Sequence, residues 1–288
     1  MKMLLEEPKL REVQGPGDPD ATHDRLTGLT LFRDLIASFK TPGFWLYGAW
    51  IDATLRYRSQ ALGAFWMVAT TLAFVVMLGT LYSQVLKVNS DLFYAHVATG
   101  YTFWFFIQQS LNMSTRIFKK NASLIQNGYV KYADYVLRLV CSQAINLGYN
   151  LLVVIGVIFF TPVHVTIEVL VLFVTVPLLL FSVLGMCIVV SIVGARYPDF
   201  GELVQTLLRL FFFITPIIWM PGQGKGAIIG TFLYGNPFYY LIEIVRGPLV
   251  YNQVPWLEIG VVAAAVPLIW LMAAVAYVRA KPFIPMWI

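Results

Sequence analysis

Charged residues divide the chain into long uncharged stretches. A helix that crosses the hydrocarbon core of a membrane needs about 20 mainly apolar residues. Five intervals between successive Asp, Glu, Lys or Arg residues are long enough and unbroken, at 59–86, 92–115, 139–167, 169–195 and 259–278. A sixth, 203–220, qualifies if Arg209 is tolerated within it. The pattern therefore predicts an all-α polytopic membrane protein with six transmembrane helices.

The stretch 226–242, between the fifth and sixth predicted spans, is uncharged but interrupted by glycines and a proline. Gly226, Gly230, Gly235 and Pro237 favour a re-entrant hairpin or short interfacial helices over a full crossing. Such irregular backbone is tolerated at membrane depth only where protein or water satisfies its polar groups. We therefore expect this outer segment to be shielded by the rest of the protein.

The residues before the first span divide into two regions. Residues 1–28 are charged and contain a Gly, Pro and Asp cluster, so we expect a disordered cytoplasmic tail that is not a signal peptide. In residues 29–58 apolar side chains recur at helical spacing and aromatic rings are dense. This pattern predicts amphipathic helices in the membrane interface, with a short cytoplasmic helix packed on protein as the alternative. Residues 59–288 then form the six-span transmembrane domain.

The distribution of positive charge indicates an orientation. With six spans and both termini in the cytoplasm, the cytoplasmic side receives every Lys and Arg except Lys87, Lys225 and Arg246. Because Lys and Arg collect on cytoplasmic loops, this topology is the one we predict. The net charge of +5 follows from the same bias, and it indicates no nucleic-acid partner.

Composition agrees with a membrane location and excludes most catalytic classes. Hydrophobic residues make up 59% of the chain and charged residues 12%, and the mean hydropathy is +0.73. A soluble domain carries about 25% charged residues. Cys141 and Cys187 lie in apolar runs, and the histidines share no helical face, so we expect no metal site.

Groups that would bind a nucleotide or carry a driving ion are missing as well. The Gly222-Gln223-Gly224-Lys225-Gly226 run has the composition of a phosphate loop, but Trp219 occupies the position of its first glycine and Gly226 that of its Ser or Thr. The predicted spans carry no acidic pair or His–carboxylate relay, which ion-coupled transporters need near the midplane. We therefore expect no catalytic residue on this chain, and a partner that supplies the energy for transport.

Five short motifs follow one another at the edges of the predicted spans. They are Arg56-Tyr57-Arg58 with Leu62-Gly63 and Trp66; Asn121-Ala122-Ser123-Leu124-Ile125; Arg196-Tyr197-Pro198-Asp199; Thr215-Pro216-Ile217-Ile218-Trp219; and Asn236-Pro237 with Glu243 and Arg246. Through their order and spacing, residues 45–277 resemble the permease subunits of ABC exporters for lipid-linked polysaccharides. That family serves O antigen, capsule, teichoic acid and cell-wall galactan.

The resemblance implies a homodimer of this chain in the bacterial cytoplasmic (inner) membrane. It also implies two cytoplasmic ABC ATPase subunits, which bind ATP and Mg, and no cofactor on this chain. The residues implied in ATPase coupling are Asn121, Leu124, Ile125, Arg196, Tyr197 and Asp199. Apart from the resemblance, solvated loops are the simpler interpretation of both segments.

Substrate contacts are interpreted from residue chemistry. Arg56 and Arg58 are candidates to meet a lipid-linked pyrophosphate, since arginine binds phosphate bidentately, and attraction to anionic lipid is the alternative. Snorkelling to headgroups is the simpler interpretation of Arg209, and a pyrophosphate contact the other. Aromatic rings pack against sugar C–H faces, so the conduit candidates are Trp66, Phe211, Phe212 and Trp219. Packing against lipid or between helices is the alternative for any single ring.

The outer segment supplies candidates for a gate, namely Asn236, Pro237, Glu243 and Arg246. The last two are three residues apart and can pair on one helical face. Taken together, the sequence predicts a transport subunit through which partner-driven ATP hydrolysis moves an undecaprenyl-linked polysaccharide, as in lipopolysaccharide O-antigen export. The alternatives are a permease for another lipid or small molecule, an autonomous secondary transporter, and a membrane enzyme acting on polyprenyl-phosphate glycans.

Overall fold

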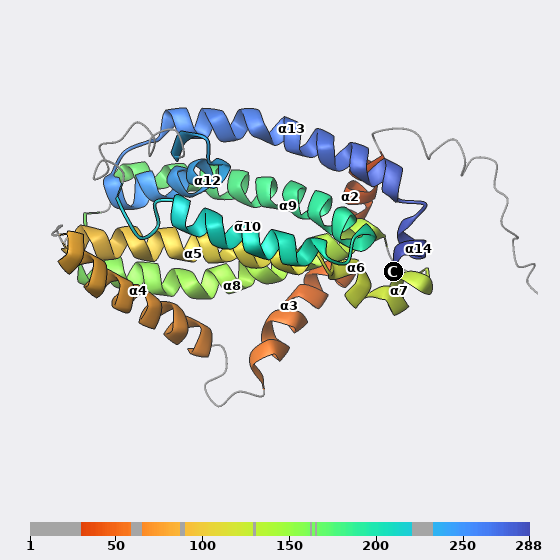
Figure 1. Cartoon of the computed structure of the whole chain (residues 1–288), viewed down its shortest axis with the longest axis horizontal. Helices are drawn as coiled ribbons and strands as arrows, with labels where there is room; N and C mark the ends of the chain where they lie inside the picture. Colours follow the sequence, from red (N-terminus) through yellow and green to blue (C-terminus); the bar gives the residue numbers. More distant parts are fainter. Residues whose placement is uncertain are drawn as a thin grey trace, which may run out of the picture.

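The computed structural model describes residues 30–58, 65–86, 90–128, 131–161, 163–164, 166–220 and 233–288. These residues form helices and their connections, with no strand among them (Figure 1). The all-α prediction is therefore confirmed for this part of the chain. The tail 1–28, the Gly222–Gly226 run and Leu62-Gly63 lie outside the described residues.

Six helices overlap the six predicted spans, and the third begins and ends seven residues before its predicted bounds, 139–167. They are α4 (Phe65–Leu86), α5 (Ser90–Ser114), α8 (Tyr132–Phe160), α9 (Leu172–Arg196), α10 (Phe200–Ile214) and α13 (Trp256–Ala280). Within the described residues, four helical segments are long and apolar enough to cross a membrane: Phe65–Tyr82, Tyr132–Phe160, Ile167–Arg196 and Trp256–Ala280. The third begins with the 3-10 turn η2 (Ile167–Val171).

Helices α5 and α10 fall outside that group for different reasons. Helix α10 has 15 residues, and at about 1.5 Å per residue it is shorter than a hydrocarbon core of roughly 30 Å. Helix α5 has 25 residues, but it carries polar side chains such as His96, Gln109 and Asn112. The count of six spans therefore stays a prediction.

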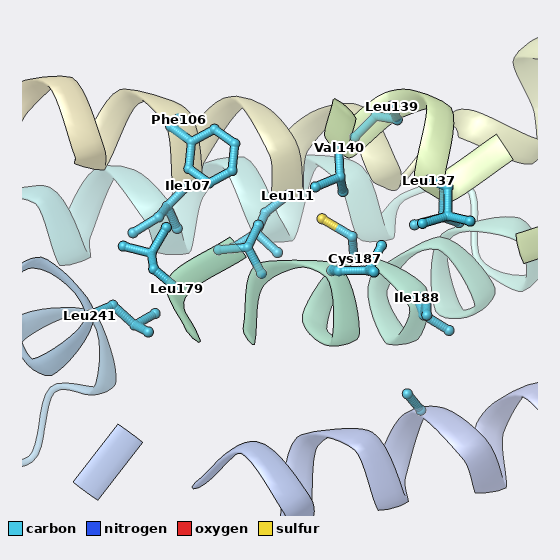
Figure 2. Close-up of a cluster of buried hydrophobic side chains, with 14 of the residues drawn as sticks. Phe106, Ile107, Leu111, Leu137, Leu139, Val140, Leu179, Cys187, Ile188 and Leu241 are labelled. Carbon is cyan, nitrogen blue, oxygen red and sulfur yellow. The ribbon is translucent and has the colours of Figure 1, made fainter. Parts of the chain in front are cut away.

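The polar character of α5 follows from its position at the centre of the bundle. It packs against α4, α8, α9 and α10, and against the short helices α12 (Pro237–Arg246) and η3 (Gly247–Tyr251), a π-helical turn. Figure 2 shows part of the resulting core, where Ile107 and Leu111 of α5 meet side chains of α8 and α9. A helix surrounded by protein does not need an apolar surface on every side.

The two ends of the bundle differ in their short elements (Figure 1). One end, which we call the α7 end, carries α6 (Ile117–Lys120), α7 (Ala122–Gln126) and α14 (Ile284–Trp287). The opposite end, the α12 end, carries α12 and η3. The described part of the predicted outer segment, from residue 233 on, therefore forms a short helix and a π turn.

The region 29–58 forms two helices, α2 (Thr30–Lys40) and α3 (Gly43–Arg58). Helix α2 buries Leu31 and Leu35 and exposes Ile36 and Phe39. Its Asp34 binds the end of α13, because Asp34 Oδ2 lies 2.7 Å from Lys281 Nζ and accepts a 2.8 Å hydrogen bond from the Tyr277 hydroxyl. Helix α3 packs against α8. Both helices were predicted, and their location at a membrane surface stays a prediction.

Candidate functional site

The first predicted coupling motif forms the turn between α6 and α7, at Asn121, and most of α7 itself. Asn121 closes α6, and its side-chain Nδ2 donates a 2.8 Å hydrogen bond to the Ile117 carbonyl. Ile125 is only 6% exposed and anchors α7 in the core, whereas Leu124 is 39% exposed. Helix α7 therefore presents Leu124 outward on a fixed support.

The second predicted coupling motif follows α9 at the same end. The Arg196 guanidinium lies 5.4 Å from the ring centre of Tyr197 and 5.3 Å from that of Trp287 in α14. Tyr197 is 54% exposed, and Asp199 is the N-cap residue of α10. Because α14 contacts both α7 and α9, it joins the two motifs into one surface. Sequence reasoning missed Trp287, which no motif singled out.

A cavity of about 830 Å³ opens beside these motifs, between α3, α5, α6, α8 and α10. It has a polar wall of amides, hydroxyls and charged groups, to which Asp52, Gln109, Asn112, Thr115, Arg116, Lys120, Asn121, Arg138, Ser142, Gln143, Glu202 and Gln205 belong. Of the predicted site residues only Asn121 is among them. The structure thus places a polar cavity where the sequence indicated only helix ends.

Two ion pairs hold the walls of this cavity. Arg138 of α8 binds Asp52 of α3 through two hydrogen bonds, Nε to Oδ2 at 2.6 Å and Nη2 to Oδ1 at 2.7 Å. Arg116 binds Glu202 of α10 at 2.7 Å. The first pair is half-buried and the second is exposed, so the first contributes more to the position of its helix.

A line of buried amides continues from the cavity into the bundle. Asn146 Nδ2 donates to Gln143 Oε1 at 3.2 Å, and Asn150 Nδ2 donates to the Asn146 carbonyl at 3.1 Å. Thr71 of α4 completes the line with a 2.7 Å hydrogen bond to Asn150 Oδ1. The spacing of these amides on α8, three and four residues apart within an uncharged span, was a signal that the sequence offered.

The α12 end contains a second buried polar cluster. The Arg246 side chain is fully buried, and its Nη1 lies 3.3 Å from Glu243 Oε2, so the pair expected from their spacing is present. Among the described residues, Arg246 Nε and Nη2 have no hydrogen-bond partner. The guanidinium fits against Gly100 of α5, where an added Cβ would lie 2.5 Å from Nη2.

Hydrogen bonds connect the residues that precede and follow α12 to α5 and to the turn after α10. His96 of α5 bonds to the Tyr251 hydroxyl at 2.6 Å and to the Trp219 carbonyl at 3.0 Å. Asn236 caps α12 by accepting from the Phe238 N–H at 3.0 Å, and its Nδ2 donates to Thr215 Oγ1 at 2.7 Å. The structure thus brings three of the predicted gate residues to one end, and Pro237 occupies the first turn of α12. His96 and Tyr251 were missed.

The predicted conduit aromatics separate into inward and outward groups. Phe211 packs edge-on against Phe238 at 5.1 Å, and Phe212 lies 6.0 Å from Trp104. Their neighbour Phe213 is exposed, as is Trp66 on α4. Trp219 is half-buried, and its Nε1 donates to the Phe213 carbonyl at 3.2 Å. Packing between helices therefore accounts for Phe211 and Phe212 within one chain.

The structure says little about the predicted phosphate-binding arginines. Arg56 and Arg58 belong to α3, and their side chains lie outside the described part of the structure. Arg209 is exposed on α10. In the described ranges, no group of three or more His, Cys, Asp or Glu residues is placed to hold a metal ion.

Comparison with known protein families shows which family the chain belongs to. The family model described as ABC-2 type transporter matches residues 46–250, from within α3 to η3. The chain belongs to the ABC-2 type transporter family. No curated protein matches the chain. As a member of this family, the chain is a multi-pass membrane component of a transporter and is not itself catalytic. The family also implies association with ABC ATPase partners.

The half-buried ion pair should stabilise this ABC-2 membrane component measurably. We expect a double-mutant cycle of Asp52→Asn and Arg138→Met to give a coupling free energy of about 1–2 kcal/mol, because the bidentate pair is only 23% and 36% exposed. The cycle is measured by thermal unfolding in nanodiscs. The matched control is Arg116→Met with Glu202→Gln, whose pair is 67% and 69% exposed and should give about 0.5 kcal/mol. Equal couplings would contradict the assignment of Asp52 and Arg138 as the anchor of α3.

Proposed function

We propose that this ABC-2 membrane component is the permease subunit of an exporter for lipid-linked polysaccharide. Two copies form the conduit with two ATPase subunits, and ATP hydrolysis moves an undecaprenyl-linked, O-antigen-like glycan across the bacterial inner membrane. The main support for ATPase coupling is that α14 contacts both α7 and α9. The two predicted coupling motifs, which expose Leu124 and Tyr197, therefore form one surface. The substrate class rests on the resemblance of the motifs to polysaccharide exporters.

The geometry of the α7 end supports docking of an ATPase subunit. Ile125 and the Asn121 turn hold α7 in place, which leaves the apolar Leu124 side chain exposed at 39%. The Tyr197 ring, 54% exposed, is braced by Arg196 and by Trp287 beyond it. Exposed apolar and aromatic groups on rigid supports are typical of the anchors of a protein interface.

Charge supports a cytoplasmic location for the α7 end. Arg116, Lys119, Lys120, Arg196 and Lys281 belong to the elements at this end. The positive-inside rule favours the cytoplasm for such a concentration of Lys and Arg. Both described chain ends, α2 and α14, then lie on the cytoplasmic side.

Helices α4 and α10 present exposed apolar side chains that are available to a second copy. Helix α10 exposes Leu203, Leu207, Leu210 and Phe213, and α4 exposes Phe65, Trp66 and Met77. Lipid covers such side chains in a single copy, and in the proposed dimer α4 and α10 border the conduit. There Trp66 and Phe213, rather than the inward Phe211 and Phe212, are the rings available to sugar.

Coupling is tested by substitutions on the proposed docking surface. With the ATPase subunit in nanodiscs, wild type should hydrolyse ATP faster when undecaprenyl-linked glycan is added. The double variant Leu124→Asp/Tyr197→Asp should lose at least about 90% of that stimulation and release the ATPase on size exclusion, because losing two interface anchors costs at least about 1.4 kcal/mol. The control is Gln253→Asp, an exposed change near the α12 end, which should behave as wild type.

Three results would contradict the proposal. Retention of stimulation by the double variant would exclude this surface as the coupling site. Stimulation by small amphiphiles but by no glycan would favour the permease for another substrate. Nucleotide-independent flux without any ATPase complex would favour an autonomous secondary transporter.

A further inference from the structure

The cavity at the α7 end has the chemistry of a sugar site. Its polar wall combines the side-chain amides of Gln109, Asn112 and Gln143 with the hydroxyls of Thr115 and Ser142. Amides donate and accept hydrogen bonds at the same time, which matches the hydroxyl groups of a saccharide. At about 830 Å³ the cavity lies within the range of small-molecule sites, roughly 300–1,000 Å³.

Charge compensation argues against a site built for phosphate. Both arginines of the wall are already engaged by carboxylates, Arg138 by Asp52 and Arg116 by Glu202. A phosphate group would compete with these carboxylates for the same guanidinium donors. Lys120 adds one exposed positive charge at the rim. The wall is therefore better matched to neutral hydroxyls than to a pyrophosphate.

Two residues of the cavity wall carry polar side-chain atoms that are buried and unpartnered. Ser142 is 2% exposed and lines the cavity, yet its hydroxyl has no hydrogen-bond partner among the described residues. Asn112 Oδ1, on the neighbouring helix α5, is also without one. A buried polar group without a partner is destabilising, so such groups are normally completed by a ligand or by water. Gln143, also in the wall, donates a 3.2 Å hydrogen bond to the Met113 sulfur.

We propose that this cavity binds the membrane-proximal sugar of the lipid-linked glycan, and that the side chains of Ser142 and Asn112 turn toward its hydroxyls when it binds. This inference rests on the proposed function, since it assigns that substrate a site within each subunit. The apolar side chains of Leu55, Ile117 and Leu139, also in the wall, supply contact for the sugar C–H groups. Helix α3, held by Asp52, forms one side of the site.

Protection of a cysteine tests the site directly. The variant Ser142→Cys is made in a Cys141→Ser background, in complex with its ATPase subunit in nanodiscs, and labelled with a charged methanethiosulfonate reagent. The probes are undecaprenyl pyrophosphate bearing N-acetylglucosamine, the same carrier bearing galactose, and the bare carrier. We expect at least one sugar-bearing carrier to slow labelling about fivefold or more, and the bare carrier to have no effect.

Two further variants sharpen the test. Asn112→Leu should raise the concentration of sugar-bearing carrier needed for half-protection about tenfold, since one hydrogen bond is lost. Lys131→Cys, exposed at the start of α8 and outside the wall of this cavity, should be labelled at the same rate with every probe.

The outcomes separate this inference from the proposed function. Equal protection by the bare carrier would overturn the sugar assignment. So would absence of protection while a sugar-bearing carrier stimulates ATP hydrolysis, and in that case the exporter proposal would stand. Failure of Ser142→Cys to react at all would show that position 142 is closed to water and would also overturn it. Protection by sugar without stimulation would support the site and count against coupled export.

Discussion

Arg246→Met is expected to lower the stability of the membrane bundle by about 3–5 kcal/mol. Arg246 is fully buried, and its partner Glu243 has a side chain only 12% exposed. Removing the arginine leaves a buried carboxylate without its counter-charge at the α12 end. The expected decrease in melting temperature in nanodiscs is about 10 °C or more.

A second substitution separates charge from packing in this prediction. In Arg246→Met/Glu243→Gln the uncompensated charge is gone, so at least about half of the lost stability should return. The control is Arg209→Met, the same exchange at an exposed position of α10, which should change the melting temperature by no more than about 2 °C. A double variant as unstable as the single one would show that Arg246 acts by filling space and not by pairing.

Gly194→Ala is expected to push α9 away from the end of α5 at the α7 end and so destabilise the bundle. An added Cβ on Gly194 would lie 2.8 Å from the Thr115 Cα and closer still to its carbonyl oxygen. Backbone atoms cannot rotate aside as a flexible side chain can, so we expect a loss of about 3 kcal/mol and a melting temperature lower by about 10 °C. Because Thr115 and Arg116 line the cavity, the same change should reduce glycan-stimulated ATP hydrolysis.

The chain offers a matched control for this glycine. Gly148 lies within α8, and an added Cβ there would meet no atom within 4 Å. Gly148→Ala should be neutral or stabilising by up to about 1 kcal/mol, because alanine favours the helix. If the two variants melted at the same temperature, close contact at Gly194 would not limit the approach of α9 to α5.

The helices could be predicted from the sequence because charge and apolar runs mark where a chain crosses lipid. The positions of α9 and α13 follow from uncharged stretches alone, whereas α8 begins seven residues before its uncharged stretch and includes Asp134 and Arg138. Helix α5 is different, since its neighbours are protein, and its polar residues weaken the apolar signal. Spacing along one helix was also sufficient for Glu243 and Arg246, because residues three apart share a helical face.

The cavity could not be predicted in the same way. Its wall combines Asp52, Asn112, Ser142 and Glu202 from four helices that are far apart in the sequence. Periodicity describes one helix at a time and gives no information about which helices pack together. The family motifs did not indicate the cavity either, since Asn121 is the one motif residue among the described residues of its wall.

The contact between α2 and α13 has a consequence for assembly. Asp34 meets Tyr277 and Lys281, which lie more than 240 positions later in the chain. A ribosome releases the chain from its amino terminus, so α2 emerges long before α13 exists. The contacts that Asp34 makes with Tyr277 and Lys281 therefore form only after the last long helix has been synthesised, and biogenesis is complete only when α2 and the end of α13 meet.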